Sequence, residues 1–441
     1  MRKRNLVLAS SFFFSLGTNI LGFSLIFRLS DRFSFTTGKI GAFIALGQLF
    51  YIIGCNIFQF FGSVLDPFKC FSAATAVVFI TSIPIGFSGS PSLLYVSYWI
   101  FSAATGLFWP PIMAWLTGGL NDTSLNREIS FFNRSWSMGN ILGPLIAGTL
   151  YNWNSKVNFL LLVISYFIVL IFLFLFWRDN RRHSWAEAEP PDTGKENLIH
   201  DERIFDERIP NATEYSGPVL SSAGEKIYPA NEDRLKSPVL RNLDKKLDLY
   251  RYRAWIGAFL SAIFVGVFTN IIPLHIRNVL GRTERIAGML LFFRCIIGFA
   301  GFSVLVKFTS WQFNRRWFLV LEGGLILCSF FFLFAGNSLF VFFFFMPVYG
   351  FINSACYNNS IFYSGATGRE PHKNMALHEI FICAGSALGT AGGGLIYQHF
   401  GYTGTYLAMI LVLGAGLGVL IRLGKKPGAL KQANTKHPKK I

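Results

Sequence analysis

Long apolar stretches, separated by short polar connections, follow one another along most of the chain. A helix that crosses a membrane needs about 20 apolar residues. Windows of that length predict twelve spans, at residues 6–28, 38–61, 70–88, 92–116, 129–150, 157–177, 254–276, 286–306, 317–336, 338–364, 375–397 and 402–422. Six spans precede a polar segment at 178–253 and six follow it. The pattern predicts an all-α membrane protein with twelve transmembrane helices in two six-helix bundles.

A glycine motif is repeated at equivalent places in the two predicted bundles. Gly139, Gly143 and Gly148 are followed 246 positions later by three further glycines, Gly385, Gly389 and Gly394. Internal repeats of this kind are typical of secondary transporters. We therefore expect two pseudo-symmetric halves, at residues 1–177 and 254–423.

The segment between the halves, residues 178–253, is rich in Glu, Pro, Asn and Ser. It cannot bury enough apolar area to fold alone, so it is predicted to be a largely flexible cytoplasmic linker. Its end, from Leu240 to Tyr250, is predicted to form a short amphipathic surface helix. Residues 424–441 form a basic tail.

Charge is distributed unevenly. Of the 23 Asp and Glu residues, 15 lie between positions 178 and 253, so the net charge of +17 falls mainly at helix ends and in the tails. This distribution indicates membrane topology and not nucleic-acid binding, with both termini cytoplasmic. The short loops favour a bacterial inner membrane.

No catalytic or metal-binding motif is apparent. The six cysteines fall in apolar runs without metal-ligand spacing and are expected to be buried small hydrophobes. The chain has no Walker loop, no Gly-x-Ser-x-Gly and no His-Glu-x-x-His. We therefore expect neither an enzyme nor a cofactor, and any transport must draw its energy from solute or ion gradients.

The 6+6 arrangement, the central linker and the motif of Gly139, Gly143, Pro144 and Gly148 resemble the major facilitator superfamily. The loop after span two keeps Gly62 and Asp66 of that superfamily's signature loop, although its basic run is reduced to one lysine. The resemblance implies that spans one, four, seven and ten line a central cavity, which opens alternately to the two sides. We expect a monomer.

An arginine near the middle of span eight is the sharpest candidate for substrate binding. At mid-membrane depth, Arg294 costs at least ~2.5 kcal/mol on insertion scales and needs a partner. We expect Arg294 to bind an anionic or strongly hydrogen-bonding solute, with Gln48, its equivalent at the 246-residue offset, facing it across the pseudo-twofold axis. The alternative is a structural salt bridge within the second bundle.

Four further candidates for substrate binding lie on polar or aromatic faces of the expected cavity helices. They are Asn19 in span one, Trp109 in span four, and Asn353 and Tyr357 in span ten. Hydrogen bonds and stacking between helices are the alternative role.

Ion coupling or gating is expected of Glu379 and Arg134, which lie near the same end of spans eleven and five. Burial in a low dielectric disfavours the charged carboxylate, as a proton-coupling site requires. Asp66, in the loop after span two, is a further candidate for coupling or gating. The alternative is structural pairing of Glu379 and Arg134 with Asp66 or with loop charges. His378 is also a candidate, although its place on the glycine face favours packing. Glu322 in span nine is expected to pair with Arg316 or Lys307.

These observations predict a secondary active transporter for a small polar solute, with an anionic solute as the leading interpretation. Its partners would be the solute, the lipid bilayer and a coupling ion, H⁺ or Na⁺. Two alternatives remain open, an exporter of amphipathic drugs or lipids and a non-transporting membrane sensor or scaffold.

Overall fold

The structure, a computed structural model, describes residues 2–62, 64–117, 122–183, 219–220, 226–227, 238–305, 311, 314–334, 336, 338–366 and 371–424. Most of the predicted linker and all of the tail after Gly424 lie outside these residues. The first half contains α1 (Arg2–Phe33), α2 (Thr37–Phe61), α3 (Pro67–Phe87), α4 (Pro91–Gly106), α5 (Trp109–Thr117), α6 (Asp122–Tyr151) and α7 (Ser155–His183). The second half contains α9 (Pro238–Asn278), α10 (Glu284–Leu305), α11 (Arg315–Phe334), α12 (Leu339–Ala366) and α13 (Pro371–Gly424). Between the two halves, β1 (Val219–Leu220) pairs antiparallel with β2 (Lys226–Ile227).

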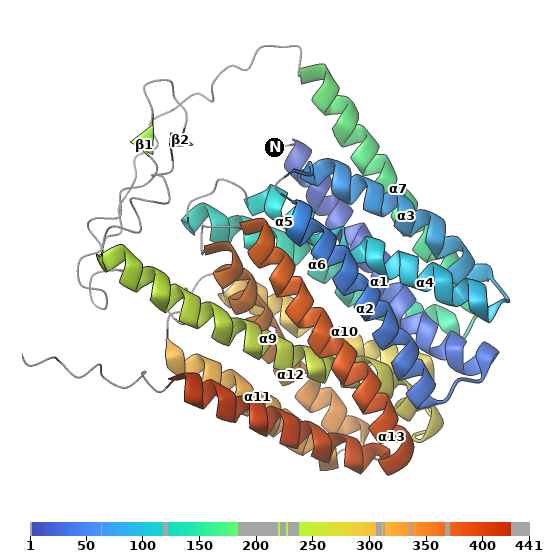
Figure 1. Cartoon of the computed structure of the whole chain (residues 1–441). Coiled ribbons are helices and arrows are strands. Elements are labelled where there is room, and N and C mark those ends of the chain that lie inside the picture. The colour runs from blue at the N-terminus through green and yellow to red at the C-terminus, as the bar shows by residue number, and fades with distance from the viewer. Residues whose placement is uncertain are drawn as a thin grey trace, which may run out of the picture.

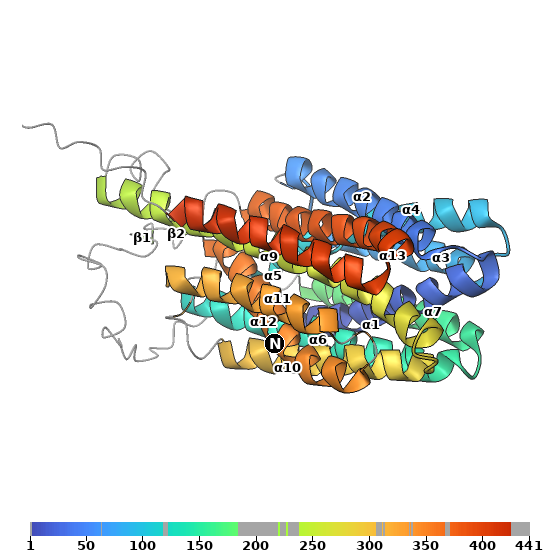
Figure 2. The same ribbon diagram turned by 90° about the horizontal axis from the view of Figure 1, so that it is seen from below.

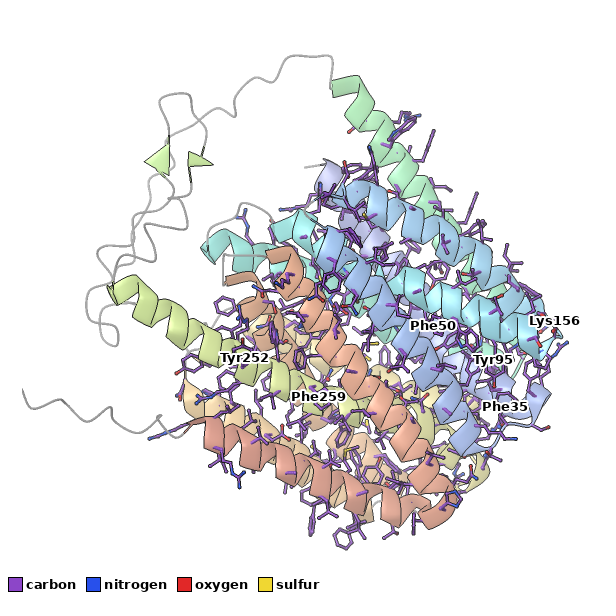
Figure 3. All side chains as sticks on the ribbon, viewed as in Figure 1. Phe35, Phe50, Tyr95, Lys156, Tyr252 and Phe259 are labelled. Carbon is purple, nitrogen blue, oxygen red and sulfur yellow. The ribbon has the colours of Figure 1, made fainter. Side chains whose placement is uncertain are left out.

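The helices have the length and surface of membrane spans. Ten helical segments in the described residues are long and apolar enough to cross a membrane. Large apolar side chains point outward around the bundle, and Phe60 and Phe340 are 71% and 76% exposed. Figure 3 shows this mostly carbon surface on the helices of both halves. Such a surface is suited to lipid and not to water.

The predicted spans differ from the helices at three places. Span four is interrupted between α4 and α5, where Pro110 and Pro111 lack the N–H groups that a continuous helix needs. Spans eleven and twelve are the two helices of α13, which are separated by a kink at Gly401, where φ is 66° and ψ is −164° and neither is helical. The predicted surface helix after Leu240 is instead the first part of the continuous helix α9. Helix α6 is not among the ten apolar segments, because its first half is polar.

The repeated glycines make repeated contacts. A side chain at Gly139 or Gly143 would collide with α1, and one at Gly385 or Gly389 would collide with α9. The last glycine of each motif faces the other half of the chain, since Gly148 lies against Gly288 of α10 and Gly394 lies against Gly41 of α2. Glycine permits this close approach of helix backbones. The motif therefore serves the same two packing contacts in both copies.

The two halves of the chain lie side by side, with roughly parallel long helices. In Figure 1 the blue and cyan helices lie on one side of the bundle and the orange and red helices on the other, and Figure 2 shows the same helices lengthwise. Helix α2 packs along α13, and α6 packs along α10. We call the contacts between residues 2–183 and 238–424 the central interface.

Candidate functional site

A buried carboxylate and two tyrosines meet at the central interface. Glu379 of α13 is 7% exposed, and its Oε2 accepts a hydrogen bond of 2.6 Å from the hydroxyl of Tyr51 on α2. The Tyr357 hydroxyl of α12 interacts with the same carboxylate. One acidic group thus joins a helix of the first half to two helices of the second.

The neighbouring histidine is fully buried beside this carboxylate. Nδ1 of His378 lies 2.7 Å from the Ser360 hydroxyl of α12, and its ring packs edge-on against Tyr357 at 5.0 Å between centroids. Its Nε2 lies 3.8 Å from Oε1 of Glu379 and makes no hydrogen bond in the described part of the chain. His378 therefore packs on α12 and also faces the Glu379 carboxylate.

Helix α6 contributes an aromatic and an amide to the same region. The Trp136 ring lies 5.1 Å from Tyr357 between centroids, and its indole N–H donates to Oδ1 of Asn133 at 3.0 Å. The Asn133 amide in turn donates to Asn358 of α12 at 3.5 Å. Polar contacts across the central interface therefore run from α2 to α13 and from α6 to α12.

Arg294 has no carboxylate partner among the described residues. It is partly buried on α10, where its Nη2 reaches the sulfur of Cys295 at 3.4 Å, and Nη1 is enclosed without a hydrogen bond. The Tyr349 hydroxyl of α12 interacts electrostatically with the guanidinium but closes no hydrogen bond of good geometry. A thiol is a weak partner for a cation, so the donors of Arg294 are largely unused.

The two residues related by the 246-residue offset do not meet. The Gln48 amide donates to the Ser386 hydroxyl of α13 at 2.9 Å, whereas Arg294 lies against α12. Asn353 is also engaged within its own half, because it accepts a hydrogen bond of 2.9 Å from Ser261 on α9. Gln48 thus contributes to the central interface, in contact with α13 and not with Arg294.

The remaining predicted residues lie apart from the Glu379 cluster. Asn19 and Ser15 of α1 both donate to Oδ1 of Asn140, at 2.5 and 2.7 Å. The other three make local contacts, with Trp109 in an aromatic group with Phe14, Phe108 and Phe132, Arg134 over the Phe131 ring and Asp66 capping α3 at the Lys69 amide.

At the opposite end of the central interface, an ion-pair network joins the end of α1 to the end of α9. Nη1 of Arg277 lies 2.9 Å from Asp31 and 3.4 Å from Glu284, and Nη2 donates to Ser30 at 3.0 Å. Tyr151 of α6 also donates to Asp31, at 3.1 Å. Asp31 and Arg277 are 246 positions apart, so this pair joins equivalent positions of the two halves.

Tyr51 and Asn140 are among the contributors that were not anticipated from the sequence. Tyr51 lies three positions after Gln48, on the same face of a helix, and this spacing could have pointed to it. Asn140 sits inside the glycine motif, whose packing onto α1 brings it beside Asn19.

Long apolar helices with buried polar side chains between them define an integral membrane protein whose polar side chains are kept away from lipid. The chain belongs to the Major Facilitator Superfamily, whose family model matches residues 7–369. It is thus a multi-pass membrane transporter of the major facilitator type. A search of curated proteins gives no match for this chain.

Proposed function

We propose that the protein is a secondary active transporter that moves a small anionic solute by alternating access. The two moving parts would be residues 1–177 and 254–423, with twelve spans and both termini on the cytoplasmic side. The repeated glycine contacts and the Asp31–Arg277 pair, which joins equivalent positions, support this division. The basic residues at the chain ends support the orientation.

The observation that carries the substrate class is the unsatisfied guanidinium of Arg294. An arginine inside the membrane ordinarily forms charge-assisted pairs with carboxylates, yet in the described residues the partners of this guanidinium are the Cys295 thiol and the Tyr349 hydroxyl. A carboxylate or phosphate group on a solute would supply the missing acceptor. The alternative of a structural salt bridge within the second half has no support in the described contacts.

The conformation is closed along the central interface. The Arg277 network closes one end, and the Tyr51–Glu379 bond lies toward the other. The best-defined cavities in the described residues are small, each about 10 Å³. A solute would reach Arg294 only after the two halves separate at one end of the central interface, as alternating access requires.

The test is an uptake screen in proteoliposomes, with and without imposed proton and sodium gradients, over a panel of small carboxylates, phosphates and neutral polar solutes. We expect gradient-driven uptake of an anion, which Arg294→Ala abolishes. Arg316→Ala, at an exposed arginine of α11, is the matched control and should transport normally. Normal uptake by Arg294→Ala would reject the anion site and favour export of amphipathic compounds.

A further inference from the structure

A second buried carboxylate lies outside the site described above. Glu322 on α11 is 1% exposed, and neither of its carboxylate oxygens has a hydrogen-bond partner in the described structure. The predicted pairing with Arg316 is therefore wrong, and Lys307, the other predicted partner, lies outside the described residues. A buried carboxylate without a partner is costly if it is ionised, so the groups around Glu322 determine its protonation state.

Glu322 borders a small cavity between three helices of the second half. The cavity has a volume of about 10 Å³, and its walls are Ala254 and Gly257 of α9, Phe318, Leu321 and Glu322 of α11, and Cys356 and Asn359 of α12. Asn359 is also 1% exposed, and its Oδ1 has no hydrogen-bond partner. A Cβ added to Gly257 would meet nothing within 4 Å. This space is sufficient for about one water molecule.

The polar lining of the cavity consists mainly of acceptors that lack donors. Two carboxylate oxygens and one amide oxygen are unsatisfied, and the other polar side-chain groups of the lining residues are the Asn359 amide nitrogen and the Cys356 thiol. A hard cation generally takes about six or more oxygen ligands, which this lining does not offer. One proton and one water would satisfy these acceptors. The protonated Glu322 carboxyl group would donate to the water, and the water would donate to the Glu322 carbonyl oxygen and to Oδ1 of Asn359.

We propose that Glu322 is a proton-binding site, in which a neutral carboxyl group is linked to Asn359 through one water. The titratable group that faces it from α12 is the Cys356 thiol, and α9 contributes only Ala254 and Gly257 to the lining. The charged residues nearest to these along α9 bond elsewhere, Arg251 to Asn374 and Arg253 to the Leu423 carbonyl. Helix α13, which also packs on α11, contributes no residue to the cavity lining.

This site has a consequence for transport that rests on the proposed function. Loss of the proton would leave an unpaired charge among apolar side chains, so Glu322 can release it only in a conformation that admits water. Helix α12 carries Asn359 of this site and also Tyr357, which interacts with Glu379. Proton release at Glu322 is thereby coupled to the rearrangement of α12 against its neighbours.

Infrared difference spectroscopy of the purified full-length protein in lipid nanodiscs tests the protonation directly. The spectrum of the wild type minus that of Glu322→Gln should contain the carbonyl band of a protonated carboxylic acid at neutral pH. Asn359→Leu, which removes the amide but keeps the acid, should shift that band because the water loses its second acceptor. Absence of the acid band, or a melting temperature that Na⁺ raises in the wild type but not in Glu322→Gln, would overturn the proposal.

Transport assays then test the coupling separately. With the solute identified in the uptake screen, Glu322→Gln should lose accumulation driven by a proton gradient but keep exchange of labelled for unlabelled solute. Accumulation at the wild-type level would refute the coupling role even if the infrared band is present. Loss of exchange in this variant would also refute it, because a coupling residue is not needed to bind solute. Absence of uptake by the wild type in the screen would instead count against the proposed function.

Discussion

The hydrogen bond from Tyr51 to Glu379 gives a direct test of how the central interface is held closed. In Tyr51→Phe the buried carboxylate loses a donor at 2.6 Å from the other half of the chain. A hydrogen bond to a charged group contributes about 1.5–3 kcal/mol. At 1.4 kcal/mol for each factor of ten, the closed form should be weakened roughly 10- to 100-fold relative to the open form.

Cys383 provides the readout, because it is buried at the same interface. Its thiol lies 3.3 Å from the Gln48 carbonyl of α2, and it can react with a maleimide only when α2 and α13 separate. A variant that keeps Cys383 and replaces the other five cysteines reports this opening alone. Tyr51→Phe should raise the alkylation rate by about the same 10- to 100-fold.

The matched control is Tyr166→Phe. Tyr166 is fully buried and lies 3.1 Å from the Thr18 hydroxyl, so its bond joins α7 to α1 within the first half. This variant should leave the alkylation rate of Cys383 unchanged. Equal rates in the wild type and in Tyr51→Phe would refute the view that Glu379 holds the central interface closed.

Two further outcomes are expected. Asp31→Asn should weaken closure at the Arg277 end by only about 0.5–1 kcal/mol, as measured by cysteine accessibility, because the pair is partly exposed and Arg277 keeps its contact with Glu284. Gly389→Ala should destabilise the protein by about 1–3 kcal/mol, because the added methyl collides with the Ile263 backbone, whereas Gly392→Ala, which meets open space, should leave the melting temperature nearly unchanged.

Membrane spans could be predicted from sequence because lipid requires long uninterrupted apolar helices. The exact helix boundaries were harder to predict, because they depend on single proline and glycine residues that a hydropathy average over about 20 residues does not resolve. Pro110 and Pro111 divide span four, and Gly401, with its non-helical φ of 66°, separates the last two helices without a longer loop. The family was also predicted correctly, since the match covers residues 7–369.

Site contacts were harder to predict, because symmetry relates positions without bringing them together. Gln48 and Arg294 are equivalent by the repeat, yet Gln48 bonds to Ser386. Asp31 and Arg277 have the same offset and do meet. Residues related by a twofold axis touch only near that axis, and a linear sequence does not reveal their distance from it.

Distances between spin labels, measured by double electron–electron resonance at both ends of the bundle, test alternating access most directly. One spin-label pair would join exposed positions Arg32 and Val279 near the Arg277 network, and the other would join Phe61 and Trp317 at the opposite end. Asp31→Asn should lengthen the first distance and shorten the second, and Tyr51→Phe should do the reverse. Two distances that lengthen together, or that do not change in either variant, would contradict the account.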